Sequence, residues 1–399
     1  MIYLKLRGRV TMNLYRKIID IQIKLMLLTS CILLLALLAF SHVSASEPIR
    51  VLSETVINQF PDGILFSLSV ESDLEIQEID IVYSTAYGSG YNHMDFQRGK
   101  NVNASFFLRT KSGGEHQSFF TPPGAVIIYH FEIFDGKILY KTNEKHFVYL
   151  DQQFQWESIS KEQVTVYFYG PVLKRADVVL TASLLAIERM SPVLGLKEIK
   201  PINIVMYNHY RHMIKALPFS SQSSREGLIT EGEAFTKMRV LLVLGSDSET
   251  EGIASHEITH ILVEDAAGNS YPLIPSWLNE GLAEYGNIIP SETYTNALEY
   301  GYMTRRLQPL FALNAFSGTP NDIVIAYGKS RNVIYYLINI YGKDKMAAMF
   351  FKLNQGFSLD QAMVETYGFN TNGLEQRWID RVNANAFLYL FSLNKPTYW

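Results

Sequence analysis

The stretch that decides the fold runs from residue 255 to residue 286 and reads SHEITHILVEDAAGNSYPLIPSWLNEGLAEYG. Its first half predicts a helix on which His256 and His260 lie four residues apart. Positions i and i+4 share one face of a helix, so both imidazoles can bind a single cation. Glu257 lies beside them on that face. Ser248, with Glu251 three residues later, has capping-box spacing and supports a helix start.

The second half of the stretch predicts a short second helix that begins near Ser276 and stops at Gly286. This helix carries Glu280, twenty residues after His260, and Glu284 one turn further on. Two imidazoles are one ligand short of a catalytic zinc site, which takes three protein ligands and a water. Glu280 offers a carboxylate, a group that such a site can use.

Composition limits the classes of site and partner. The chain has 399 residues, a formal net charge of −4 and one cysteine, Cys31. A single cysteine excludes a disulfide framework and a cysteine zinc cluster, so any metal must be bound by His, Asp or Glu. The acidic balance argues against a nucleic-acid partner. With nine histidines, the His-x-x-x-His pattern alone is not decisive, and a structural histidine pair is the alternative.

These motifs resemble the gluzincin metallopeptidases, the group that contains thermolysin and the M1 aminopeptidases. The resemblance rests on His-Glu-x-x-His, 19 intervening residues and then Asn-Glu-Gly-x-Ala at residues 279–283. A more specific likeness is to the peptidase MA-like family of secreted bacterial proteins, in which a β-domain precedes a compact gluzincin domain. This likeness is specific only from about residue 255 to residue 342.

The resemblance implies a role for each motif residue. His256, His260 and Glu280 would bind Zn²⁺, and zinc would lower the pKa of its water to about 7. Glu257 would take the proton of that water and later protonate the leaving amine. Glu284 would accept a hydrogen bond from a zinc-bound imidazole, by analogy with thermolysin. An ordinary solvated charge is the alternative for Glu284.

The M1 enzymes also place a tyrosine as oxyanion donor at the head of a later helix, before a Lys-Gly pair. Here the corresponding stretch reads AYGKS at residues 326–330, with Gly and Lys reversed, and Tyr327 is the candidate. A packed core tyrosine is the alternative, and His209 and His212 are other candidate donors. Since the M1 Gly-x-Met-Glu-Asn motif is absent, we expect an endopeptidase. By the same analogy the strand at residues 239–244 would form the sheet edge that binds an extended substrate.

The first 46 residues differ in character from the rest. Residues 25–40 form an uncharged, mostly apolar run preceded by six basic residues and followed by the small residues 43–45. This pattern predicts a secretory signal peptide, and an uncleaved membrane anchor is the alternative. Either would place the rest of the chain outside the cytoplasm. Without residues 1–46, the chain would carry 29 basic and 38 acidic residues and no cysteine.

The remaining chain predicts two domains and an α+β fold. Residues 47–152 alternate apolar and polar residues in six or seven short runs, which predicts an immunoglobulin-like β-sandwich as an accessory domain. Asp135-Gly136 between two apolar runs predicts a hairpin. Residues 153–399 show strands and a helix that ends near Ser191-Pro192, and then mostly helices, which predicts a gluzincin-like domain with a helical C-terminal lobe.

The sequence therefore predicts an extracytoplasmic zinc metallopeptidase, secreted or tethered by its N-terminal apolar segment, with a peptide or protein substrate. Two alternatives stay open at this point. One is a cell-surface interaction protein with an inactive gluzincin domain, and the other is a zinc hydrolase that acts on a non-peptide bond.

Overall fold

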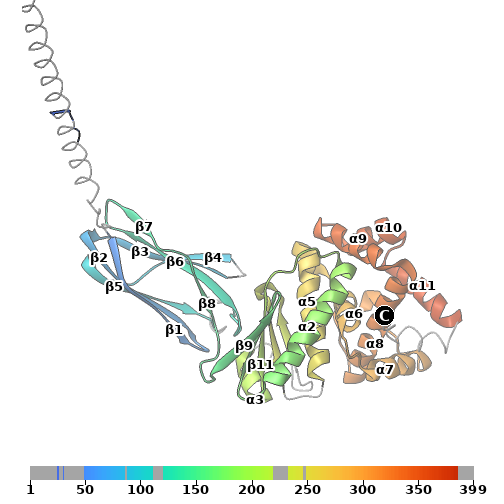
Figure 1. Ribbon diagram of the computed structural model, residues 1–399. Coiled ribbons are helices and arrows are strands. Elements are labelled where there is room, and N and C mark those ends of the chain that lie inside the picture. Colours follow the sequence, from blue (N-terminus) through green and yellow to red (C-terminus); the bar gives the residue numbers. More distant parts are fainter. Residues whose placement is uncertain are drawn as a thin grey trace, which may run out of the picture.

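The computed structural model describes residues 25–26, 30, 49–85, 88–110, 120–218, 232–245 and 249–384. In Figure 1 two β-sheets lie at one end, a third sheet lies in the middle, and the helices of the C-terminal half lie at the other end. No helix in the described part is long and apolar enough to cross a bilayer. Most of the apolar run at residues 25–40, including Cys31, lies outside the described residues.

The N-terminal β-structure is a sandwich of two antiparallel sheets, as predicted. Its strands are β1 (Ile49–Gln59), β2 (Gly63–Ile76), β3 (Glu78–Thr85), β4 (Gly88–His93), β5 (Gly99–Arg109), β6 (Val126–Phe134), β7 (Leu139–Lys141) and β8 (Lys145–Val148). One sheet has the order β1-β2-β5 and the other β4-β3-β6-β7, with β8 also paired to β6.

Alternation along the strands builds the core of this sandwich. On β2, Ile64 and Phe66 are fully buried, and they pack with Ile81 and Phe131 of the facing sheet. A strand points successive side chains to opposite faces, so one apolar face per sheet is enough to make the core. The predicted hairpin at Asp135-Gly136 is confirmed, because it joins β6 to β7. The predicted domain limits stay a prediction.

The middle sheet has the strand order β12-β13-β11-β10-β9. Its strands are β9 (Trp156–Lys161), β10 (Val164–Tyr169), β11 (Ile202–Tyr207), β12 (Gly232–Phe235) and β13 (Val240–Leu244). The three inner strands are parallel to one another and the two outer ones antiparallel. The predicted edge at residues 239–244 is therefore wrong, since β13 lies inside the sheet and β12 forms the edge. A strand of four residues is too short to leave a clear period in the sequence.

The long helices α2 (Leu173–Leu194) and α5 (Thr250–Ala267) cover one face of this sheet (Figure 1). The other face packs against the short helices α3 (Tyr210–Met213) and η1 (Ile214–Ala216) and against Ala125 of the β-sandwich. Asn203 on β11 also donates a hydrogen bond to the carbonyl oxygen of Gly124, at 2.8 Å. The sandwich is thus packed against the sheet.

Helix α2 is longer than its sequence indicates, because Pro192 does not end it. The helix continues to Leu194 with Pro192 inside its last turn. Val193 and Leu194 bury their side chains in the core, and Gly195 closes the helix in the left-handed conformation. Proline removes one backbone hydrogen bond, and we attribute its tolerance here to apolar burial and the glycine cap.

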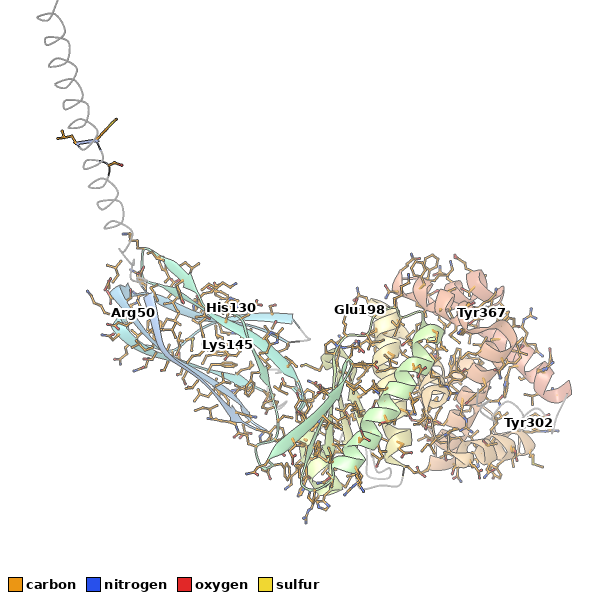
Figure 2. All side chains as sticks on the ribbon, in the orientation of Figure 1. Arg50, His130, Lys145, Glu198, Tyr302 and Tyr367 are labelled. Carbon is orange, nitrogen blue, oxygen red and sulfur yellow. The ribbon has the colours of Figure 1, made fainter. Side chains whose placement is uncertain are left out.

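The remaining helices form the C-terminal helical region that the sequence predicts. They are η3 (Gly268–Leu273), α6 (Ser276–Gly286), α7 (Glu292–Met303), η4 (Leu310–Ala312), α8 (Pro320–Tyr341), α9 (Lys343–Asn354), α10 (Leu359–Tyr367) and α11 (Thr371–Ala384). The short helix η2 (Thr236–Met238) instead joins β12 to β13 in the middle sheet. Figure 2 labels Tyr302 at the end of α7 and Tyr367 at the end of α10, on opposite sides of this region. The fold is therefore α+β.

Candidate metal centre

Helix α5 carries the predicted His-Glu-x-x-His motif. Its side chains Ala254, Ile258 and Ile261 are fully buried, and this fixes the rotation of the helix. Positions 256, 257 and 260 consequently face a cavity of about 310 Å³. The Nε2 atoms of His256 and His260 lie 3.3 Å apart, as expected for two residues one turn apart.

The start of α5 differs from the expected capping box. The N-cap is Glu249 and makes no side-chain capping hydrogen bond. Ser248 lies outside the described residues. Thr250 instead donates its hydroxyl to the carbonyl oxygen of Leu244, at 3.1 Å, and so ties the helix to the end of β13.

Helix α6 brings Glu280 to the same point. Its Oε2 lies 3.4 Å from Nε2 of His256 and 3.6 Å from Nε2 of His260. Ser276 is the first residue of the helix and Pro275 the N-cap. The backbone N–H groups of Ser276 and Trp277 donate to the carbonyls of residues 314 and 313, which satisfies two donors that a helix start leaves free.

The three side chains form a donor set that fits a metal ion. Two imidazole nitrogens and one carboxylate oxygen lie within 4.8 Å of one another, and this is the His₂Glu set of catalytic zinc sites. Burial would raise the pKa of Glu280, but the imidazoles of His260 and His256 outweigh burial and lower that pKa to about 2. Glu280 is thus held as a carboxylate, the form that binds a cation.

Each histidine is oriented by an oxygen acceptor at Nδ1, the ring nitrogen that does not face Glu280. Nδ1 of His256 lies 2.7 Å from Oε1 of Glu284, and Nδ1 of His260 lies 3.0 Å from Oδ1 of Asn279. An oxygen acceptor on Nδ1 selects the tautomer with its proton there and leaves the Nε2 lone pair for the metal. Glu284 is buried and hydrogen-bonded, so the alternative of a solvated charge is wrong for it.

The orientation of Asn279 is fixed by a second contact, because its amide nitrogen approaches the hydroxyl of Tyr271 at 3.4 Å. Asn279 and Tyr271 both line the cavity. Neither was among the predicted site residues. For Asn279 the sequence did carry a signal, since this residue directly precedes the Glu280 ligand candidate in the quoted motif.

Glu257 lines the cavity next to the ligand candidates and contacts the edge strand β12. Its Oε2 accepts a hydrogen bond from the backbone N–H of Ala234, at 3.1 Å. Residues Gly232, Glu233, Ala234 and Thr236 also line the cavity. This strand, which was not predicted from the sequence, holds one oxygen of the Glu257 carboxylate at the wall of the cavity.

Tyr327 on α8 also reaches the cavity. Its ring centroid lies 6.5 Å from that of His256 and 5.1 Å from that of Tyr294, on which it is stacked. Burial and the charge of Glu280 raise the pKa of Tyr327, which keeps the phenol protonated as an O–H donor at neutral pH. The residue is packed against other rings and also lines the cavity, and its role as oxyanion donor stays a prediction.

The other candidate donors lie elsewhere. His212 on α3 contacts the hydroxyl of Tyr169 through Nδ1, at 3.2 Å, and its ring packs on Phe154. His209 precedes the same helix. Helix α3 covers the face of the middle sheet opposite to α5, and neither histidine lines the cavity at Glu280. Their proposed role as oxyanion donors is therefore not supported.

Comparison with known families decides the affiliation of the chain. The family model described as the Peptidase MA superfamily matches residues 182–384. The chain belongs to the peptidase MA superfamily. The match covers α5, α6 and α8, and hence every residue of the candidate metal centre. No curated protein matches this peptidase MA chain.

Solved structures with similarity to this peptidase MA protein include an M1 zinc metallopeptidase from Deinococcus radiodurans. It has 10% identity and a TM-score of 0.36, over 88% of this chain and 96% of that one. A glutamate-to-alanine mutant of that enzyme has 9% identity and a TM-score of 0.35, over 79% and 89%. A Br derivative of BhCBM56 has 12% identity and a TM-score of 0.18, over 26% and 95%.

Proposed function

We propose that this peptidase MA protein is a zinc-dependent peptidase that acts outside the cytoplasm. The observation that carries the proposal is the convergence of Nε2 of His256, Nε2 of His260 and Oε2 of Glu280, with Glu257 beside them in an open cavity. His256, His260 and Glu280 would hold Zn²⁺. When bound, zinc supplies a Lewis acid that polarises a carbonyl and lowers the pKa of water to about 7.

The side chains around the cavity support a division of roles. Glu257 would take the proton of the attacking water on a carboxylate oxygen and later give it to the leaving amine. The Ala234 N–H holds one of its oxygens in place. Tyr327, protonated at neutral pH, would donate its O–H to the oxygen that becomes negative during attack on the carbonyl.

The sheet edge supports binding of an extended peptide. Strand β12 forms the edge of the middle sheet and lines the cavity beside Glu257. An extended substrate could add to this edge through backbone hydrogen bonds. Since the Gly-x-Met-Glu-Asn motif is absent from the sequence, we propose endopeptidase rather than aminopeptidase action. Export would follow from the apolar segment at residues 25–40.

Two alternatives remain as outcomes of the test: a catalytically inactive interaction protein, and a zinc hydrolase of a non-peptide bond. The experiment is a peptide-library digest with zinc analysis on the full chain and on Glu257→Gln. We expect wild type to bind zinc and cleave peptides blocked at both ends. The variant should keep its zinc and lose about 100- to 10,000-fold in kcat, the usual contribution of a general base.

Three results would contradict this proposal. Folded wild type without zinc would refute the metal assignment. Zinc binding without cleavage of any peptide would favour an inactive protein or a non-peptide hydrolase. Equal cleavage by wild type and Glu257→Gln would exclude Glu257 as the base. For the exported form, an N-terminus at Ser46 would show a cleaved signal peptide.

A further inference from the structure

Arg331 is a buried cation on α8, one turn after Tyr327. Its side chain is 2% exposed and does not line the cavity. Burying a guanidinium group is unfavourable unless a charge or hydrogen-bond acceptors compensate. Its partners therefore indicate what it does.

One of these partners is the carboxylate of Glu284, which also contacts the ligand candidate His256. Nη1 of Arg331 lies 3.9 Å from Oε2 of Glu284, while Oε1 of Glu284 contacts Nδ1 of His256 at 2.7 Å. Among the described residues, Oε2 has no hydrogen-bond partner. The separation of 3.9 Å is too long for a direct hydrogen bond, so charge attraction links the two groups. A chain of contacts thus runs from Arg331 through Glu284 to His256.

The guanidinium group is fixed in this place by helix α7. Nη1 donates to the carbonyl oxygen of Ser291 at 2.9 Å, and Nη2 donates to Oγ1 of Thr295 at 2.6 Å. The ring of Tyr294 lies beneath the guanidinium carbon, at 5.7 Å. Helix α7 can lie this close because residue 328 is glycine, where a Cβ would come within 2.2 Å of the carbonyl oxygen of Tyr294.

We propose that Arg331 is a positioning residue of the metal centre. Its charge holds the Glu284 carboxylate where Oε1 accepts the Nδ1 proton of His256, and this keeps Nε2 of His256 aimed at the zinc ion. The inference rests on the proposed zinc site. Because Arg331 is buried outside the cavity and bonded to α7, a direct contact with substrate is disfavoured.

The test is a double-mutant cycle on the affinity of the full chain for zinc, measured by competition with a chromophoric chelator. The proteins are wild type, Arg331→Met, Glu284→Gln and the double variant. We expect Arg331→Met to weaken zinc binding by about 10- to 100-fold, the range for groups that orient a metal ligand. In the Glu284→Gln background the same substitution should change the affinity by less than about threefold, because the group it acts through is gone.

Two further variants separate positioning from packing. Arg331→Lys keeps the charge and should restore zinc affinity to within about tenfold of wild type. Thr295→Val removes one hydrogen bond to the guanidinium group but leaves Glu284 paired, so it should change affinity by less than about threefold. If Arg331→Met does not fold, Arg331→Lys makes the same comparison with and without Glu284→Gln. We then expect a modest loss of zinc affinity when Glu284 is present and no loss when it is replaced.

Each contrary result has a distinct meaning. A wild type that is folded and binds no zinc refutes the proposed function, and this inference with it. If wild type binds zinc and Arg331→Met binds it equally well, the inference alone is refuted. Equal weakening in both backgrounds means that Arg331 acts on the fold and not through Glu284. A raised KM with unchanged zinc affinity would mean a substrate contact instead.

Discussion

Two regions of the described chain pair histidines with carboxylates, and they differ in whether the pairing gathers a donor set that fits a metal ion. On the β-sandwich, Nδ1 of His93 contacts Asp80, and Nε2 of His130 lies 3.3 Å from Glu132. Figure 2 labels His130 on this sandwich, well separated from the helices of the C-terminal half. In the other region, His256 and His260 turn both Nε2 atoms toward Glu280.

The two regions differ in whether the histidine nitrogens point toward a common point, and not in how many contacts each histidine makes. The His93 side chain is 75% exposed and its carboxylate partner is also bonded to Tyr91. At the metal centre each histidine uses Nδ1 for an oxygen behind it and keeps Nε2 for the common point. Among the described residues, the set of His256, His260 and Glu280 is the one group with metal-binding spacing.

The largest expected effect comes from His260→Ala with His93→Ala as the matched control. Loss of a group that is hydrogen-bonded to a metal ligand lowers metal affinity by up to roughly 100-fold. Removing a ligand itself should lower zinc affinity by more than this, and cleavage should fall below detection. The control removes an exposed histidine that contacts the buried Asp80 carboxylate, and it should leave both zinc affinity and cleavage unchanged. Zinc content and peptide cleavage by the two full-length variants test this. Equal loss in both would mean that the two regions do not differ as described.

Tyr327→Phe removes the hydroxyl at the cavity and keeps the ring. We expect kcat to fall by about 100- to 1,000-fold, the usual cost of one oxyanion donor, with zinc affinity nearly unchanged. Tyr294→Phe is the matched control, because Tyr294 stacks on Tyr327 and does not line the cavity. Steady-state kinetics on a single peptide measures both. A similar kcat for Tyr327→Phe and wild type would exclude the donor role.

Asn279→Ala removes the acceptor behind His260. Without it the imidazole loses the contact that fixes its tautomer, so zinc affinity should fall by about tenfold. Leu282, fully buried on the same helix, supplies the control, since Leu282→Val perturbs packing and no hydrogen bond. Chelator competition on both variants is the measurement. If Leu282→Val weakened zinc binding as much as Asn279→Ala, the loss could not be attributed to the hydrogen bond by which Asn279 orients His260.

The smallest effect concerns a carboxylate of the sandwich with a structural role. The pKa of Asp135 is lowered by the backbone N–H of Ile138 first, and then by that of Lys137 and the hydroxyl of Ser72. A lowered pKa in the folded state means stability that is present above the unfolded pKa of about 3.9 and lost as pH falls through the folded pKa. Wild type should unfold a few degrees above Asp135→Asn at pH 7.

This difference should shrink as pH falls below about 4, where the carboxyl group is protonated first in the unfolded state, and it is lost once pH falls through the lowered pKa of the folded state. Thermal unfolding of both proteins followed by circular dichroism between pH 7 and pH 3 tests this, and zinc affinity at pH 7 should not change. A difference in unfolding temperature that stays constant across this range would show that the charge of Asp135 contributes nothing.

What could be predicted from the sequence is local in character. His256 and His260 are one turn apart, so helix geometry was enough to pair them. Glu280 was placed as the third ligand through the resemblance of its motif to the gluzincins. Tyr327 was reachable only through resemblance. Strand β12 has four residues and no detectable period. Arg331 on α8 meets Glu284 on α6 and is held by α7, which Gly328 lets lie close to α8. Such contacts depend on the tertiary packing of distant segments.

The central claim is that His256, His260 and Glu280 form one zinc site, and the most direct test is the zinc stoichiometry of the full chain. Purified wild type, stripped with a chelator and dialysed against zinc, should hold one equivalent by elemental analysis. Glu280→Ala should hold much less while its circular dichroism spectrum stays that of wild type. Folded wild type without zinc, or a full equivalent retained by Glu280→Ala, would contradict the account.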